Sequence, residues 1–313
     1  MPLPMFEKKK DPPPPFSHVK NIIGIAAGKG GVGKSTLTVN LARALQRMGY
    51  AVGVMDTDLY GPSIRRMLPE DHMPNQQGEK IVPANSKGIK LISMAYFRPE
   101  EEATAVRAPI ANKILGQFIN GVEWGELDFL LIDFPPGTGD IQLTLGQQAR
   151  LNGAVMVTTP QEVALGDVRR GIGMFKKTAA PVLGIVENMA WFEDPTGAKT
   201  YIFGKGGAER TAQEMGVPFL GALPLYTDIG ATSDSGQPIA ATAPDSPAGK
   251  FFEALALKTL EGIAAGAGAS PSAMAAPANT RAVSPTCRVP SPNTRPRMAQ
   301  RRAGASSRPI RKS

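Results

Sequence analysis

Apolar runs alternate along this chain with segments whose apolar residues recur at helical spacing. Continuous runs rich in Ile, Val and Leu predict strands that are buried on both faces. Six such strands are predicted at 22–27, 51–56, 128–133, 153–159, 181–188 and 219–222, and a further apolar run lies at 88–97. The helical spacing predicts helices at 37–48, 110–120, 141–150, 163–177, 208–215 and 249–261.

This alternation predicts an α/β fold, a doubly wound and mostly parallel sheet covered by helices on both faces. Ligands of such sheets bind at the carboxyl ends of the strands. We expect a single domain over residues 20–261. Residues 1–19 are rich in Pro and Lys and are interpreted as a flexible leader. Residues 262–313 consist mainly of Ala, Pro, Ser and Arg, and we expect disorder there because large apolar residues are scarce.

The net charge of +8 is unevenly distributed along the chain. Nine basic residues and no acidic residue follow position 261, which leaves 26 basic and 27 acidic residues before it. The predicted domain is therefore close to neutral, so neither nucleic acid nor a membrane is an expected partner. No run approaches the roughly 20 apolar residues of a membrane span. A single cysteine, Cys287, and the lack of a secretory signal favour the cytoplasm.

The segment GKGGVGKST follows the first predicted strand and precedes the first predicted helix. It satisfies the P-loop pattern G-x-x-x-x-G-K-[ST] in the context that the pattern requires. Backbone N–H groups of such a loop surround phosphates, Lys34 contacts the β- and γ-phosphates, and Ser35 supplies a hydroxyl to Mg²⁺. The segment therefore predicts that the protein binds ATP with Mg²⁺ and hydrolyses it. The predicted nucleotide-binding residues are Gly28, Lys29, Gly30, Gly31, Val32, Gly33, Lys34, Ser35 and Thr36.

Three aspartates lie at the ends of predicted strands. Asp56 ends the second strand and Asp58 follows it, and Asp133 ends the strand at 128–133. Carboxylates at strand ends beside a phosphate site bind Mg²⁺ or its waters and orient an attacking water. Asp133 matches a Walker B carboxylate, whereas a simple turn-forming role is the alternative for the other two. We predict Ser35, Asp56 and Asp133 as metal ligands. Asp140 is predicted to cap the helix that follows it.

The doubled-lysine loop resembles the deviant Walker A motif of the MinD/ParA/Mrp class of ATPases. The strings DTDLYGPS, LLIDFPPGTGD, VTTPQEVAL and VENMAWF follow it in order. Together they resemble the Mrp/ApbC-type iron–sulfur cluster carrier ATPases over residues 19–247. The resemblance implies a role in iron–sulfur cluster assembly or transfer to apoproteins. It also implies a homodimer in which Lys29 reaches the phosphates bound by the partner subunit.

The resemblance also implies roles for individual residues. Lys29, Lys34, Asp58 and Asp133 match the catalytic residues, with Asp58 positioning the hydrolytic water. Asn188 matches the asparagine that recognises the adenine edge, and Pro224 lies in the loop that flanks the base. An amide at the carboxyl end of a strand also suits base recognition, because it offers both a donor and an acceptor. A turn residue at the strand end is the alternative for Asn188.

The chain departs from the carrier pattern after VENM. Cluster-carrying members have a C-x-x-C pair there, but residues 191–204 contain no cysteine. A dimer of this chain would offer only two thiolates, both from Cys287, whereas clusters take four. A tightly held cluster is therefore not expected. The protein would act on a partner that holds the cluster, bind a cluster weakly with other ligands, or have only the ATP-driven switch.

The competing function is that of a MinD- or ParA-like positioning or regulatory switch ATPase without a cluster role. The basic residues after position 261 could then contact phosphates of DNA or lipid. This segment has neither interleaved aromatic residues nor an amphipathic period, which favours an extension without such a role. The helix at 249–261 is predicted to pack on the sheet rather than on a membrane.

Overall fold

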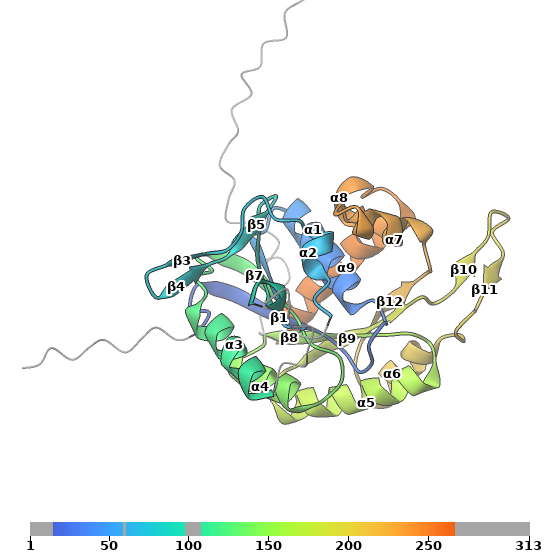
Figure 1. The fold of residues 1–313 in the computed structure, drawn as a ribbon. Coiled ribbons are helices and arrows are strands. Elements are labelled where there is room, and N and C mark those ends of the chain that lie inside the picture. Colours follow the sequence, from blue (N-terminus) through green and yellow to red (C-terminus); the bar gives the residue numbers. More distant parts are fainter. Residues whose placement is uncertain (1–14, 59–60, 98–107, 267–313) are drawn as a thin grey trace, which may run out of the picture. The chain divides into compact units, whose positions relative to one another are not determined.

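Eight strands form the central sheet of this protein, whose computed structural model describes residues 15–58, 61–97 and 108–266. The order of strands is β12-β9-β8-β1-β7-β2-β6-β5, and only the edge strand β5 runs antiparallel to its neighbour (Figure 1). The predicted α/β fold with a mostly parallel sheet is confirmed. The strands are β1 (Val19–Ala27), β2 (Val52–Asp56), β5 (Ala84–Ser86), β6 (Ile89–Ser93), β7 (Leu127–Asp133), β8 (Gly153–Thr158), β9 (Val182–Asn188) and β12 (Phe219–Leu223).

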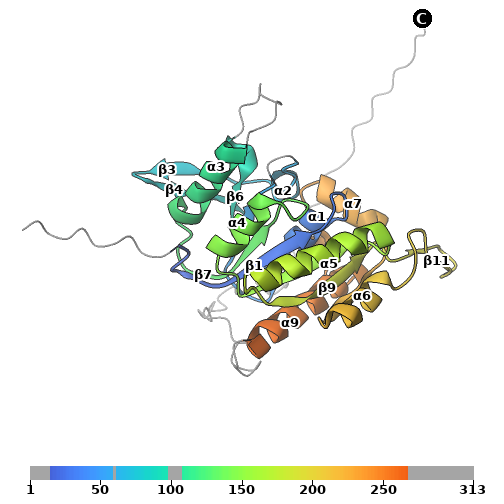
Figure 2. The same ribbon diagram turned by 90° about the horizontal axis from the view of Figure 1, so that it is seen from below.

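Helices cover both faces of the sheet, as expected for a doubly wound fold (Figure 1; Figure 2). One face carries α1 (Lys34–Arg47), α2 (Ile64–Met67), α7 (Thr227–Asp234), α8 (Ile239–Thr242) and α9 (Pro247–Gly266). The other carries α3 (Ala108–Gly121), α4 (Asp140–Gln148), α5 (Glu162–Lys177) and α6 (Gly207–Met215). All six predicted helices are present, with ends that differ by a few residues.

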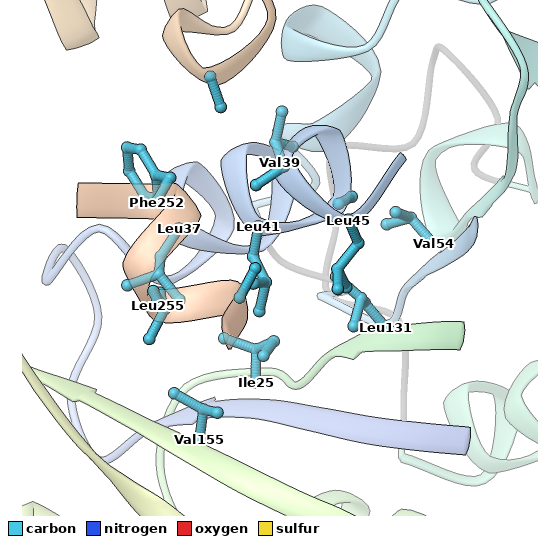
Figure 3. Close-up of a cluster of buried hydrophobic side chains, with 14 of the residues drawn as sticks. Ile25, Leu37, Val39, Leu41, Leu45, Val54, Leu131, Val155, Phe252 and Leu255 are labelled. Carbon is cyan, nitrogen blue, oxygen red and sulfur yellow. The ribbon is translucent and has the colours of Figure 1, made fainter. Parts of the chain in front are cut away.

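The first hydrophobic layer lies between the sheet and helices α1 and α9. Leu37, Leu41 and Leu45 recur every fourth residue on α1, so they share one face of that helix. Figure 3 shows this face turned toward Ile25, Leu131 and Val155 of the sheet, and Phe252 and Leu255 of α9 beside it. The last predicted helix therefore packs on the sheet, as expected. This packing fixes the first turn of α1, where the P-loop ends.

A second hydrophobic layer covers the opposite face of the sheet. Its largest members are the fully buried rings of Phe118, Phe134 and Phe175. The rings of Phe134 and Phe175 meet edge to face with centroids 5.6 Å apart. Phe134 directly follows Asp133, so this contact fixes the segment that leaves β7 at the carboxyl edge of the sheet.

Several short elements were not predicted from the sequence. Two hairpins lie outside the main sheet: β3 (Asn75–Gln77) with β4 (Lys80–Val82), and β10 (Phe192–Glu193) with β11 (Lys199–Thr200). The helices α2, α7 and α8 were also missed, as was the 3₁₀ helix η1 (Met94–Phe97). The missed strands have two or three residues and the missed helices four to eight, too few to show an apolar run or a helical period.

The described part of the chain continues α9 to Gly266, beyond the expected end of the domain at residue 261. Most of the predicted leader, the segment after residue 266 and Cys287 lie outside the described residues. Among the helices of the described ranges, none has the length and apolarity to cross a bilayer.

Candidate nucleotide-binding site

The glycine-rich loop connects the carboxyl end of β1 to the first turn of α1. Gly33 precedes the helix with φ 85°, a left-handed conformation that favours glycine. A Cβ atom on Gly33 would lie 2.2 Å from Nδ2 of Asn188, so the loop also needs the missing side chain there. Asn188 Nδ2 donates a hydrogen bond of 2.9 Å to the carbonyl of Val32. Asn188, at the end of β9, therefore fixes the loop from a strand that is separated from β1 by β8.

Asp133 is the centre of a buried polar cluster behind the loop. Lys34 Nζ and Ser35 Oγ donate to Asp133 Oδ2 at 2.6 and 2.7 Å. Thr38 Oγ1 donates to the other carboxylate oxygen at 2.7 Å. Asp133 is completely buried and Lys34 almost completely, so water screens this ion pair little. The lysine and hydroxyl of the P-loop are thus in direct contact with the carboxylate of the predicted Walker B strand, a contact that the sequence analysis did not predict.

Asp56 lies beside Asp133 in the same row of the sheet. The register aligns Ser93 with Asp56 and Asp56 with Asp133 on three adjacent strands. Ser93 Oγ donates to Asp56 at 2.8 Å, and the Asp58 N–H donates to it at 3.1 Å. Burial, followed by the charge of Asp133, raises the pKa of Asp56 to about 7, although these hydrogen bonds oppose the rise. Near pH 7 the row therefore carries less negative charge than two fully ionised carboxylates would.

Lys29 and Asp58 line the outer side of this cluster. Both border a pocket of about 490 Å³, together with the loop residues Gly30, Gly31, Gly33, Lys34, Ser35 and Thr36. Lys29 is exposed, whereas Asp58 is buried and accepts a hydrogen bond from the Gly61 N–H at 3.1 Å. Gly28 is half-buried beneath the loop, where a Cβ atom would lie 2.3 Å from Asp167 of α5. The pocket has the lining that a triphosphate requires, with backbone N–H groups and two lysines.

A second pocket of about 570 Å³ continues from the first. The two pockets share Gly33, Thr36, Ser63 and Met189. The second is lined by Asn188 and Pro224, the residues predicted to flank the base, and by side chains of α7 and α9. Its lining is largely apolar with a few polar groups, which is typical of a site for a planar base. The two pockets together match the phosphate and base halves of a nucleotide.

The donor atoms of the site fit Mg²⁺ better than a softer metal. Ser35, Asp56 and Asp133 offer only oxygen atoms, the ligands that Mg²⁺ prefers. Within the described ranges, no cluster of three or more His, Cys, Asp or Glu side chains is arranged to hold a metal ion. Mg²⁺ typically binds one or two carboxylates together with substrate phosphates, so this set is sufficient for a metal that arrives with the nucleotide.

One predicted contact is wrong, and several contacts were missed. Asp140 is the first residue of α4, but Gly139 holds the capping position and no side chain caps the helix. An acidic residue there still faces the positive end of the helix dipole. The missed residues are hydroxyls, Thr38 on Asp133 and Ser93 on Asp56. The contact of Thr38 could have been predicted from its position, because it lies four residues after Lys34 and so on the same face of the helix.

The segment at 191–204, where the cluster carriers that the sequence resembles have a cysteine pair, forms the β10–β11 hairpin and its base. In Figure 1 this hairpin extends from the end of β9 away from the sheet. The rings of Trp191 and Tyr201 lie 6.4 Å apart at its base. Lys199 lies over the Trp191 ring and Lys205 over the Tyr201 ring, at 4.5 and 5.0 Å. Aromatic rings and ammonium groups therefore stand where the sequence pattern led us to look for thiolates.

Comparison with known proteins gives one consistent result. Residues 18–260 match the ParA family profile described as NUBPL iron-transfer P-loop NTPase. An iron–sulfur cluster carrier protein from Aquifex aeolicus is 44% identical over 257 residues, which cover 81% of this chain and 69% of that protein. The iron–sulfur cluster transfer protein NUBPL from Dictyostelium discoideum is 45% identical over 240 residues, which cover 75% of this chain and 74% of that protein.

Solved structures contain the same fold. A nucleotide-binding protein from Archaeoglobus fulgidus, in complex with ADP, is 40% identical and has a TM-score of 0.62. The match covers 70% of this chain and 88% of that protein. A relative with this fold thus binds an adenine nucleotide.

Proposed function

Since this chain belongs to the ParA family of NUBPL iron-transfer P-loop NTPases, we propose that it binds and hydrolyses ATP with Mg²⁺. We further propose that it uses this reaction in iron–sulfur cluster assembly or in cluster transfer to apoproteins, like the relatives named for those roles. The expected compartment is the cytoplasm.

The observation that carries the nucleotide part of this proposal is the pair of joined pockets over the Asp56–Asp133 row. The phosphates would lie against the loop N–H groups and the first turn of α1, whose dipole favours anions. Lys34 would then exchange its ion pair with Asp133 for the phosphates. Ser35, Asp133 and Asp56 would hold Mg²⁺, which neutralises phosphate charge. The base would occupy the pocket beside Asn188 and Pro224.

Hydrolysis needs a water opposite the leaving group and a positive charge on the transferred phosphoryl group. We assign the first task to Asp58, which borders the phosphate pocket beside Gly61. We assign the second to Lys29, which makes no hydrogen bond or ion pair with another described residue. A homodimer that joins two such sites would place Lys29 of each chain against the other's nucleotide. Turnover in the absence of a partner protein is expected to be slow.

The cluster part of the proposal does not require a cluster site within one chain. The only cysteine, Cys287, supplies one thiolate per chain, whereas a cluster takes four ligands. The hairpin side chains Glu193 and Asp194 offer hard oxygen atoms, which bind iron–sulfur clusters poorly. We therefore propose that a partner protein or added ligands hold the cluster, and that the nucleotide state of this chain controls its assembly or transfer. The partner would be a scaffold or a client apoprotein.

The nucleotide proposal is tested by Mg²⁺-dependent phosphate release and by nucleotide affinity. Wild-type protein should bind ATP and hydrolyse it slowly. Lys34→Ala should lose binding, whereas Lys29→Ala should keep binding and lose at least about tenfold in turnover, because its charge acts on the transition state. Unchanged turnover in Lys29→Ala, with unchanged dimer content, would refute the role across the interface.

The cluster proposal is tested by anaerobic reconstitution with iron and sulfide. Iron content and visible absorption are measured on the intact protein and on Cys287→Ala. Both forms should remain without a stable cluster when no partner or added thiol is present. A stable cluster in the intact protein would show that the ligand argument is wrong, and the variant would then report whether Cys287 holds it.

A further inference from the structure

A buried hydroxyl without a hydrogen-bond partner lies in the pocket assigned to the base. Ser233 is on α7 and is 7% exposed. Its Oγ atom is buried and forms no hydrogen bond with the described residues. Ser233 also lines the 570 Å³ pocket. A buried hydroxyl almost always has a partner in a folded protein. The Oγ atom is hidden from solvent in this conformation, so it can meet a bound ligand once the side chain turns toward the pocket that Ser233 lines.

The position of Ser233 places it at the base end of the joined pockets. The residues shared with the phosphate pocket are Gly33, Thr36, Ser63 and Met189, and Ser233 is not among them. Ser233 instead lies one turn after Ile229 on α7, and both residues line the base pocket with the buried ring of Phe252. Of the two pockets, Ser233 therefore lines only the one assigned to the base.

Asn188 and Asp234, two other polar residues of the same pocket, have partners in the protein. Asn188 donates from Nδ2 to the Val32 carbonyl, and its Oδ1 accepts from the Met189 N–H at 3.0 Å. Asp234 forms an exposed ion pair with Arg66, with 3.5 Å between Nε and Oδ1. The Asn188 amide thus has only part of its capacity left for a ligand.

We propose that the Ser233 hydroxyl hydrogen-bonds an edge of the adenine base and is a specificity-determining residue of this site. The inference rests on the proposed binding of ATP and adds a contact that neither the P-loop motif nor the comparisons assign. A hydroxyl both donates and accepts, so it can pair with a ring nitrogen or with the 6-amino group of adenine. A nucleotide without the matching atom would leave the hydroxyl buried and unpaired, which is how such a site discriminates.

The test compares Ser233→Ala with the wild type for a series of nucleotides, by calorimetry. ATP should bind the variant about 3–10-fold more weakly, the usual effect of one neutral hydrogen bond. Base analogues that each lack one edge atom (purine riboside triphosphate, 1-deaza-ATP, 3-deaza-ATP and 7-deaza-ATP) identify the partner. At least one of them should bind the wild type and the variant equally. Tripolyphosphate, which occupies the phosphate half only, should bind both proteins equally.

Ser235→Ala is the matched control. Ser235 lies two residues away, is exposed, and donates to the Thr232 carbonyl at 2.9 Å without lining the pocket. Its loss should leave the affinity for ATP unchanged. Ser233→Ala should also keep the melting temperature of the nucleotide-free protein, because no hydrogen bond is removed there.

The outcomes separate this inference from the function on which it rests. If the wild type does not bind ATP, the proposed function fails. If the wild type binds ATP and Ser233→Ala binds it equally well, only the role of Ser233 is overturned. If Ser233→Ala binds tripolyphosphate more weakly than the wild type, or melts at a lower temperature, Ser233 has a structural role instead. Ser233→Ala could bind ATP more weakly than the wild type while both proteins bind 2′-deoxy- or 3′-deoxy-ATP, and none of the base analogues, equally. This result would place the contact on the ribose and overturn the base assignment.

Discussion

Asp133 accepts hydrogen bonds from Lys34, Ser35 and Thr38, and its backbone carbonyl accepts one from the Thr57 hydroxyl at 2.6 Å. Only the ammonium of Lys34 in this set carries positive charge. The same side chain is therefore assigned two tasks, balancing the buried carboxylate without nucleotide and binding phosphate with it. Substitutions at this pair should separate stability from activity.

Lys34→Ala should lower the free energy of unfolding by about 3 kcal/mol, because it leaves the Asp133 carboxylate buried and without a cation. Asp133→Asn added to this variant should recover much of the loss, since the neutral amide needs no counter-charge. Neither protein should hydrolyse ATP. Chemical denaturation without nucleotide measures the first effect and phosphate release the second. A double variant as unstable as Lys34→Ala would contradict the assigned charge balance.

Asp56 gives the nucleotide-free protein a specific pH dependence. Its pKa of about 7 in the folded state exceeds the value of about 3.9 for an unfolded chain. The unfolded state therefore releases this proton first, so the group destabilises the fold as pH rises from about 4 to about 7 and changes little above that. Asp56→Asn has no carboxyl group at this position, so its stability lacks this contribution to the pH dependence.

The stability of Asp56→Asn relative to the wild type should rise between pH 5 and pH 8, by up to about 3 kcal/mol. Unfolding by urea in the presence of EDTA at several pH values measures the difference. A difference that does not change with pH would show that Asp56 is ionised throughout this range in the folded protein.

Among the secondary-structure elements, the contact between the P-loop and β9 orders the site. Gly33 and Gly31 both have positive φ, 85° and 81°, but only Gly33 lies against Asn188. A Cβ atom on Gly31 would meet nothing within 4 Å. Substitutions at Gly31 and Gly33 therefore distinguish the cost of backbone strain from the cost of losing the contact with β9.

Gly31→Ala should cost about 1 kcal/mol of stability from the left-handed backbone alone. Gly33→Ala should cost about 1–2 kcal/mol more, because its methyl group displaces the Asn188 amide from the Val32 carbonyl. Combining Gly33→Ala with Asn188→Ala should remove the clash. The double variant should therefore lose less stability than the sum of the losses of the two single variants. Equal losses at Gly31 and Gly33, measured by denaturation, would argue against this contact.

The sequence pattern predicted the long elements better than the short ones. The strands β1, β7, β8 and β9 each contain at least five consecutive buried residues, so their apolar runs are unambiguous. The helix α7 mixes polar and small residues, so its place beside the pocket becomes visible only in the fold. The same limit explains why the sequence analysis missed Ser233, because nothing local distinguishes a serine that lines a pocket from one on the surface.

The motifs of the site were predictable because each follows a strand of the same sheet. In a parallel sheet such positions meet at one edge, which brought Lys34, Asp56 and Asp133 together. Recognition of the base by Asn188 stays a prediction, whereas its hydrogen bond to the P-loop is a contact that the sequence analysis did not predict. That contact depends on the distance between the ends of β9 and β1, which are separated by β8 in the sheet, and the sequence does not contain this distance.

For the molecule as a whole, the basic residues after position 266 give the sharpest test against the competing switch function. All nine basic residues of 267–313 would be lost on truncation after Gly266. We expect the truncated protein to keep the melting temperature, ATP turnover and cellular distribution of the full chain. A DNA- or membrane-positioned ATPase should lose its localisation and its salt-sensitive binding to polyanions.

The most direct test of the account is made in cells from which the gene has been deleted. The measurement is the activity of iron–sulfur enzymes relative to cluster-free enzymes, with the wild type or Lys34→Ala supplied in trans at equal levels. We predict that iron–sulfur enzyme activity falls on deletion, and that the wild type and Cys287→Ala restore it but Lys34→Ala does not. Unchanged iron–sulfur enzyme activity in the deletion strain, or full restoration by Lys34→Ala, would contradict an ATP-driven role in cluster assembly or transfer.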